Sequence, residues 1–459
     1  EISKFQKACN KVYEMFLSAE KIVVMNMPLM QFTVYACILG ISWLGAKMIV
    51  GSSLTTGELM SLLTYCMNIL MSLMMLSMVF VMVTMSIASA ERVTEVLNEK
   101  ADICNPENPV MEVKDGSVVF DHVDFRYKKD APDYALKGID LSIRSGETIG
   151  IIGGTGSSKS SLVNLISRLY DVENGSVLVG GKDVREYDLE VLRNEVAVVL
   201  QKNVLFSGTI LDNLRWGDKE ATKEECIRAC KLACADEFIQ KLPNGYETYI
   251  EQGGTNVSGG QKQRVAMGRS LVRNPNVFLM DEPLAHLDAK LRNSMRTELK
   301  KIQADLGSTC IYVTHDFLEA MALGDRIAIV KEGRIVQVGS GDEIYYLPCN
   351  KFVAQLMGEP QINIIAGKMM VNGSQRQFVI NVLGQEVALP MPEDAPLFAK
   401  LDQLGEVSLE MGLRPQNIAY RFEPAEGYFK ATVYSYESIG NKSVIVAECG
   451  GYQVRMVAP

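Results

Sequence analysis

A short glycine- and serine-rich stretch contains the residues that could hold a chain of phosphates. The stretch "GGTGSSKSS", residues 153–161, follows the apolar run "ETIGII" and precedes an amphipathic segment. Glycines let the backbone turn so that amide groups point inward, and the N-terminus of the following helix adds its positive dipole end. We expect Lys159 to bridge the β- and γ-phosphates of ATP and the Ser160 hydroxyl to bind Mg²⁺. The predicted phosphate site comprises Gly153, Gly154, Thr155, Gly156, Ser157, Ser158, Lys159, Ser160 and Ser161.

Position 158 departs from the strict phosphate-loop pattern, which has glycine where this chain has Ser158. If the backbone there needs a positive φ, serine costs about 1–2 kcal/mol. A glycine- and serine-rich loop that lies beside a lysine by chance is the alternative. The flanking strand and helix patterns favour the phosphate loop.

Four polar side chains follow apolar runs that we expect to be strands. "NVFLMDEP" contains Asp281 and Glu282, "CIYVTHD" contains His315 and "VAVVLQ" ends in Gln201. In open α/β sheets ligands bind at the carboxyl ends of the strands, so these side chains should meet in one crevice. We expect Asp281 to hold Mg²⁺ through water and Glu282 to orient and deprotonate the attacking water, which commonly raises a rate about 10²–10⁴-fold. His315 would contact the γ-phosphate, and Gln201 would reach both metal and water.

The elements that must position these residues follow a simple order. From about residue 117 short apolar runs alternate with helical segments, which predicts a parallel sheet covered on both faces. Beyond about residue 360, alternating stretches separated by glycine predict a small OB-like β-barrel. We place the α/β ATPase domain at 117–345 and a linker with a partial barrel at 346–459.

Two uncharged segments precede this domain. No charged residue lies between Lys21 and Lys47 or between Glu58 and Glu91, and about 20 apolar residues suffice to cross a bilayer. We predict membrane helices at about 22–48 and 59–88 within a membrane region at 1–100, then a linker at 101–116. The lysines and arginine outside the hairpin place its outer ends on the cytoplasmic side. A pair of buried core helices is the alternative.

Composition limits the function classes. The net charge of −9 and the absence of a long basic run argue against nucleic acid as a partner. The ten cysteines are scattered, which suits a reducing compartment. Cys226, Cys230 and Cys234 recur every fourth residue, a spacing that suits either a metal site or, as we favour, small residues packing a buried helix face.

The loop "SGGQ" completes a set of motifs that resembles the ABC transporter ATPases. The resemblance implies that Ser258, Gly259, Gly260 and Gln261 serve the γ-phosphate bound by an opposite ATPase, so that two ATPs close a head-to-tail dimer. It also implies that Tyr127 in "VDFRY" stacks on adenine, an exposed strand tyrosine being the alternative. Asp288 in "LAHLD" resembles the residue that links the two sites.

The resemblance differs between the two parts of the chain. Residues 1 to about 264, including "ASAERVTEVL" and "LQKNVLFSGTILDNLRWG", resemble exporters that fuse membrane helices to the ATPase. Residues from about 258 to 459, including "NPNVFLMDEPLAHLDAKLR" and "MGLRPQNI", resemble the ATPase subunits of maltose-type sugar importers, whose C-terminal barrels are regulatory. We interpret the chain as a chimera truncated at both ends, produced by recombination or by an assembly error.

These patterns predict an ATP-hydrolysing subunit that drives export across the bacterial plasma membrane, with its ATPase domain in the cytoplasm. A second ATPase subunit, identical or different, would complete the composite sites. The first alternative is the ATPase subunit of a carbohydrate importer, which would bind separate permease subunits. The second is an ATP-binding fragment that transports nothing.

Overall fold

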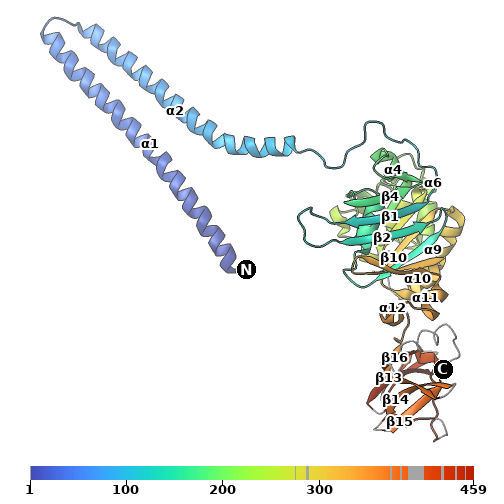
Figure 1. The fold of residues 1–459 in the computed structure, drawn as a ribbon. Helices are drawn as coiled ribbons and strands as arrows, with labels where there is room; N and C mark the ends of the chain where they lie inside the picture. Colours follow the sequence, from blue (N-terminus) through green and yellow to red (C-terminus); the bar gives the residue numbers. More distant parts are fainter. Residues whose placement is uncertain are drawn as a thin grey trace. The chain divides into compact units, whose positions relative to one another are not determined.

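A computed structural model gives the fold of the 459-residue chain. It describes residues 2–273, 275–285, 289–372, 375–382, 385–390, 408–424, 428–439, 442–449 and 451–458. The chain divides into two compact units, Glu1–Asp102 and Ile103–Pro459 (Figure 1).

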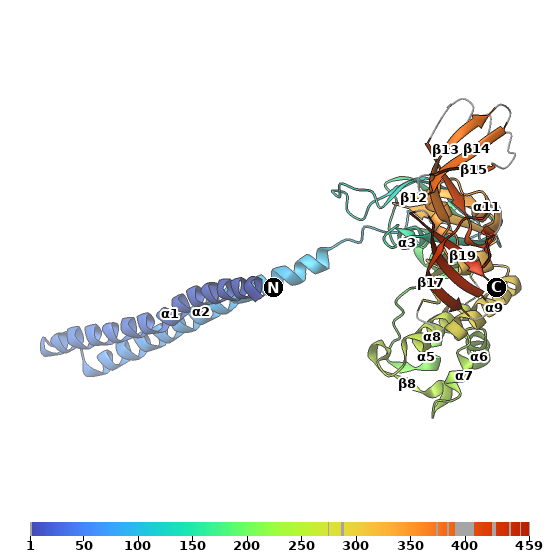
Figure 2. The ribbon, with the colours of Figure 1, turned by 90° about the horizontal axis from the view of Figure 1, so that it is seen from below.

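The first unit is a helical hairpin of α1 (Ile2–Val50) and α2 (Thr56–Asn98), visible in Figures 1 and 2. The chain enters α2 through a capping box, in which the Thr55 side chain accepts a hydrogen bond from the Glu58 amide and the Glu58 carboxylate accepts one from Thr55. Near the turn, a Cβ added to Gly45 would lie 2.3 Å from Leu59 Cδ1, so glycine permits the two helices to approach there.

Both helices extend beyond the predicted spans of 22–48 and 59–88. The flanking charged segments contain lysine and glutamate, which are good helix formers, so the helices continue past the apolar stretches. By length and composition alone, Pro28–Val50 and Thr56–Asn98 could each cross a membrane.

The second unit contains a six-stranded sheet with the strand order β12-β11-β3-β10-β9-β6. Five strands are parallel and β12 is antiparallel to β11. Every residue of the three central strands is buried, as in a parallel sheet covered on both faces. The predicted parallel sheet is therefore confirmed. Its strands are β3 (Thr148–Gly153), β6 (Val196–Val199), β9 (Val277–Asp281), β10 (Thr309–Thr314), β11 (Arg326–Lys331) and β12 (Arg334–Gly339).

A second, antiparallel sheet with the order β2-β1-β4-β5 was not predicted. Its apolar side chains share one core with β3 and with α3 (Lys159–Ile166). These strands bury alternate residues and contain bulges, so their short patterns resemble loops more than a sheet. The strands are β1 (Val118–Phe125), β2 (Leu136–Ile143), β4 (Asn174–Val179) and β5 (Lys182–Asp183).

Helices form a separate core with β6, β9 and β10. Cys226 and Cys230 are buried in it, and all ten cysteines are unpaired. Burial raises the pKa of the Cys230 thiol to about 12. The predicted packing role of this stripe is therefore confirmed. The helices are α5 (Ile210–Arg215), α6 (Lys223–Leu232), α7 (Asp236–Ile239), α8 (Gly259–Val272) and α9 (Ala289–Leu306).

The chain beyond the ATPase sheet forms α11 (Gly341–Tyr346), α12 (Lys351–Leu356) and two antiparallel sheets. Hydrogen bonds join the two sheets. The Asn363 side-chain amide donates to the Arg455 carbonyl at 2.9 Å and accepts from the Arg455 backbone amide at 2.7 Å, and the Tyr452 hydroxyl donates to the Ala366 carbonyl at 3.4 Å. The predicted β-rich region is present, and its closure into an OB-like barrel stays a prediction. The strands are β13 (Asn363–Asn372), β14 (Gln375–Val382), β15 (Gln385–Pro390) and β16 (Ser408–Leu413), then β17 (Thr432–Ile439), β18 (Lys442–Cys449) and β19 (Tyr452–Ala458).

Candidate functional site

Three neighbouring strands of the parallel sheet, β10, β9 and β6, bring the predicted polar residues together. Asp281 ends β9 and Glu282 follows it, His315 follows β10, and Gln201 lies two residues after β6. The Gln201 side-chain amide donates to Glu282 Oε2 at 2.7 Å, and His315 Nδ1 lies 3.6 Å from Glu282 Oε1. The expectation that these side chains meet at one sheet edge is confirmed.

The phosphate loop follows β3, the strand beside β10, and folds back on its own lysine. Lys159 Nζ donates to the carbonyls of Gly153 and Gly154 at 2.9 and 3.1 Å. A Cβ on Gly153 would lie 2.3 Å from the Val330 carbonyl, so glycine is required there. The Ser157 hydroxyl is buried and has no hydrogen-bond partner among the described residues. This loop therefore offers an unsatisfied donor and a lysine held only by neutral carbonyls.

Ser158 adopts the left-handed conformation that the sequence left open. Its φ is 72° and its ψ is 26°, and its side chain makes no capping hydrogen bond to α3. Gly156, two residues earlier, has a φ of 78°. Ser158 therefore carries a free-energy cost for its left-handed backbone conformation that glycine would not carry.

Burial sets the electrostatics of the loop and the acids beside it. It raises the pKa of Asp281, and the neighbouring Glu282 adds to that rise, while the Ser160 hydrogen bond and Lys159 oppose it. Burial also lowers the pKa of Lys159, against the effect of the two carboxylates. Two carboxylates thus face one partly desolvated ammonium, an arrangement that an additional cation would stabilise.

The oxygen donors fit Mg²⁺. Ser160 lies close enough to Asp281 to lower the pKa of its carboxyl, so the two predicted ligands are neighbours. Mg²⁺ prefers oxygen donors and is usually bound by one or two carboxylates together with phosphates and water. Gln201, the third predicted ligand, is bonded to Glu282 instead.

Glu282 has an unusual backbone that the sequence did not indicate. Its φ is 47°, its amide donates to the Val313 carbonyl at 2.9 Å, and its carbonyl accepts a long bond of 3.4 Å from the Gln263 side chain. Gln263 is only 2% exposed. Strained conformations of this kind persist where the surroundings hold them, often at functional sites. Gln263 lies on the buried face of α8, just after "SGGQ", and the sequence alone does not show which backbone group it contacts.

Tyr127 lies just beyond β1, beside the phosphate loop. Its hydroxyl is 2.7 Å from Ser161 Oγ, and its ring contacts Phe125 and Tyr170 edge to face at 4.9 and 5.1 Å between centroids. The side chain is 52% exposed. Tyr127 therefore lies outside the strand and is only partly exposed, with contacts to the phosphate loop and to two aromatic rings. Its stacking on adenine stays a prediction.

The "SGGQ" loop forms the N-terminus of α8. Ser258 caps the helix by accepting from the Gln261 amide at 3.3 Å, and the Gln261 side chain accepts from the Ser258 amide at 2.9 Å. A Cβ on Gly259 would meet nothing within 4 Å, so this end of the helix is open to a ligand. Gly260 is the next residue of the same turn. Asp288 lies outside the described residues.

Comparison with known proteins gives matches to both kinds of transporter. The family described as "ABC transporter" matches residues 136–285. The "Uncharacterized ABC transporter ATP-binding protein YfiB" of Bacillus subtilis is 35% identical over 75% of this chain and 59% of its own length. The "sn-glycerol-3-phosphate import ATP-binding protein UgpC" of Vibrio cholerae is 38% identical over 62% of this chain and 70% of its own length.

A solved structure of a bacterial Atm1-family ABC exporter with ATP bound is similar in fold. It has a TM-score of 0.65 and 29% sequence identity, and the match covers 72% of this chain and 57% of that one. The chain spans 59% of the length of YfiB.

Proposed function

The chain belongs to the ABC transporter family, and on that premise we propose that it binds and hydrolyses ATP to drive transport. The observation that carries the proposal is the meeting of Glu282, Gln201 and His315 at the sheet edge that also bears the phosphate loop. ATP is bound in the exporter structure of similar fold, and the predicted phosphate loop follows β3 here.

Each residue has a distinct part in this proposal. Lys159 leaves the loop carbonyls for the β- and γ-phosphates, and the free Ser157 hydroxyl and the loop amides face them. Glu282 accepts a proton from the attacking water, which Gln201 helps to hold, while His315 contacts the γ-phosphate. Ser160 and Asp281 hold Mg²⁺, which neutralises charge on the phosphates.

We infer export as the direction. The hairpin α1–α2 and the ATPase belong to one chain, and an exporter structure matches 72% of it. In this proposal the hairpin lies in the bacterial plasma membrane and the ATPase in the cytoplasm, and a second ATPase subunit supplies its "SGGQ" loop to each site.

An importer motor is the second candidate. The similarity to UgpC covers 70% of that importer protein, and two antiparallel sheets follow the ATPase. It would bind separate permease subunits, whereas the export reading needs none.

The test of ATP hydrolysis is the substitution Glu282→Gln in the full chain. Glutamine keeps the shape and can still accept from Gln201, but it cannot take a proton, so phosphate release should fall by about 10²-fold or more. Binding of a fluorescent ATP analogue should persist, and Lys159→Ala should abolish that binding. Glu220→Gln, on an exposed turn, is the matched control. Full phosphate release by Glu282→Gln would refute the assignment of the base.

A further inference from the structure

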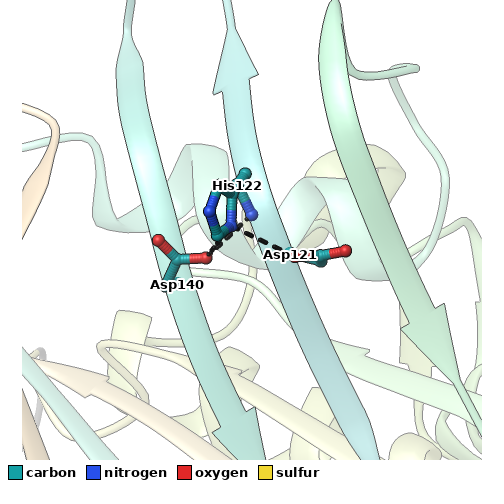
Figure 3. A group of neighbouring side chains, drawn as sticks. All are labelled: Asp121, His122 and Asp140. Carbon is teal, nitrogen blue, oxygen red and sulfur yellow. Dashed lines mark hydrogen bonds and ion pairs between the residues drawn. The ribbon is translucent and has the colours of Figure 1, made fainter.

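A second group of ligating side chains lies on the antiparallel sheet, outside the proposed ATP site. Among the described residues, Asp121, His122 and Asp140 form the one group of three or more whose ligand atoms all lie within 4.8 Å of one another (Figure 3). Asp121 and His122 belong to β1 and Asp140 to β2.

A β-bulge creates this juxtaposition. Phe120 pairs with Leu141 and Val123 with Ile139, so Asp121 and His122 together oppose the single residue Asp140. Adjacent residues of a regular strand point to opposite faces, whereas both bulge residues here are exposed. His122, with a φ of 49°, turns toward the carboxylates. Three ligating groups therefore converge on one side of the hairpin.

One of the two distances from the His122 ring is that of neighbouring ligands around a metal ion, and the other is shorter. His122 Nδ1 lies 2.6 Å from Asp140 Oδ1 and 3.1 Å from Asp121 Oδ1. Ligands at right angles around an ion at about 2.0–2.2 Å are about 2.8–3.1 Å apart. The His122 amide also donates to Asp140 Oδ1 at 2.9 Å, which fixes that carboxylate. Small side-chain rotations are enough to lengthen the distance between His122 Nδ1 and Asp140 Oδ1 to that of neighbouring metal ligands.

We propose that Asp121, His122 and Asp140 bind a transition-metal dication such as Zn²⁺ or Ni²⁺. The imidazole suits these ions better than Mg²⁺ or Ca²⁺, which prefer oxygen ligands, and the two carboxylates neutralise the two positive charges. The histidine side chain is 81% exposed, so water can occupy the remaining positions. The competing explanation for the closeness of these three side chains is that they form only ion pairs with one another.

The small number of histidines makes a direct test feasible. The chain contains three histidines, so the full-length protein labelled with ¹³C in the imidazole rings gives few signals. The His122→Ala variant identifies the His122 signal by its loss. Titration with Zn²⁺ should shift that signal, and a chelator should restore it. Binding of Zn²⁺ to the ten cysteines does not enter this readout.

Carboxylate variants distinguish a metal site from an isolated histidine. Asp140→Asn and Asp121→Asn should each weaken the Zn²⁺ dependence of the His122 signal about tenfold or more. Asp133→Asn, on the exposed loop between β1 and β2, should leave it unchanged. The proposal is overturned if Zn²⁺ shifts only the other imidazoles, or if the carboxylate variants respond like the unaltered protein.

Discussion

Ser158 occupies a backbone conformation that costs serine energy at the centre of the phosphate loop. Its φ of 72° is one that glycine adopts freely, and its hydroxyl gives no capping bond in return. We therefore expect Ser158→Gly to stabilise the fold by about 0.5–1 kcal/mol, since part of the relief of about 1–2 kcal/mol is offset by the greater freedom of glycine in the unfolded chain.

Thermal unfolding of the full chain in detergent measures this effect. The midpoint of the ATPase transition should rise by about 1–4 °C, with ATP binding retained. Ser142→Gly, at an exposed position of β2 without a positive φ, should lower the midpoint instead. A lower midpoint for Ser158→Gly would show that the serine contributes an interaction that outweighs its strain.

At this scale the sequence located residues better than conformations. Asp281, Glu282, His315 and Gln201 were predictable because each follows an apolar run, and parallel strands end at one edge. The contact between Gln263 and the Glu282 carbonyl was not predictable, because it depends on how α8 lies against β9 in three dimensions.

At the scale of elements, the linker between the hairpin and the ATPase domain is hydrogen-bonded to the start of one helix, α4. The Asn105 side chain donates to Asp188 Oδ2 at 2.5 Å and accepts from the Leu189 amide at 2.9 Å, at the first turn of α4 (Leu189–Glu195). Farther along, the Val110 amide donates to the Glu186 carbonyl at 2.8 Å. Because α4 runs directly into β6 and then Gln201, movement of the linker can reach the ATP site through one short segment.

Asn105→Ala should loosen this segment. Loss of one capping contact costs about 0.5–2 kcal/mol, so amide hydrogen exchange at the start of α4 should accelerate about 2- to 30-fold. Exchange in β3 should stay unchanged. Asn108→Ala, in the same linker, is the control. Equal exchange at α4 in Asn105→Ala and the unaltered protein would show that the side chain does not secure the linker.

Elements differed in how well the sequence predicted them. Continuous apolar runs identify β3, β9 and β10, because both faces of a parallel sheet are buried. The sheet of β1, β2, β4 and β5 escaped prediction, because a bulge interrupts the alternation of β1 and one of its two pairing partners, β4, is distant in sequence. The strands after residue 360 were visible as alternating patterns, but such patterns do not determine how two sheets close.

At the scale of the whole molecule, the chain joins an exporter-like part to an importer-like part. Similarity to YfiB covers 75% of the chain and similarity to UgpC covers 62%, so the two matched regions share part of the chain. We propose that a join within this shared region preserves the sheet edge and its acids. In this proposal, ATP hydrolysis and the direction of transport need separate tests.

The subunits with which the chain assembles therefore test the direction of transport, which the ATPase domain alone does not determine. If the chain works as an exporter half, the Glu282→Gln variant purified in detergent should form dimers of itself when ATP is added, because ATP then joins two ATPase domains and is not hydrolysed. Light scattering should report a doubling of the protein mass with ATP, and Lys159→Ala introduced into the same variant should prevent it. An importer motor would instead be recovered from its native membrane with stoichiometric amounts of different membrane subunits, identified by mass spectrometry. Dimers recovered without other membrane subunits would support export. Constant recovery of such subunits with the chain would assign it to import.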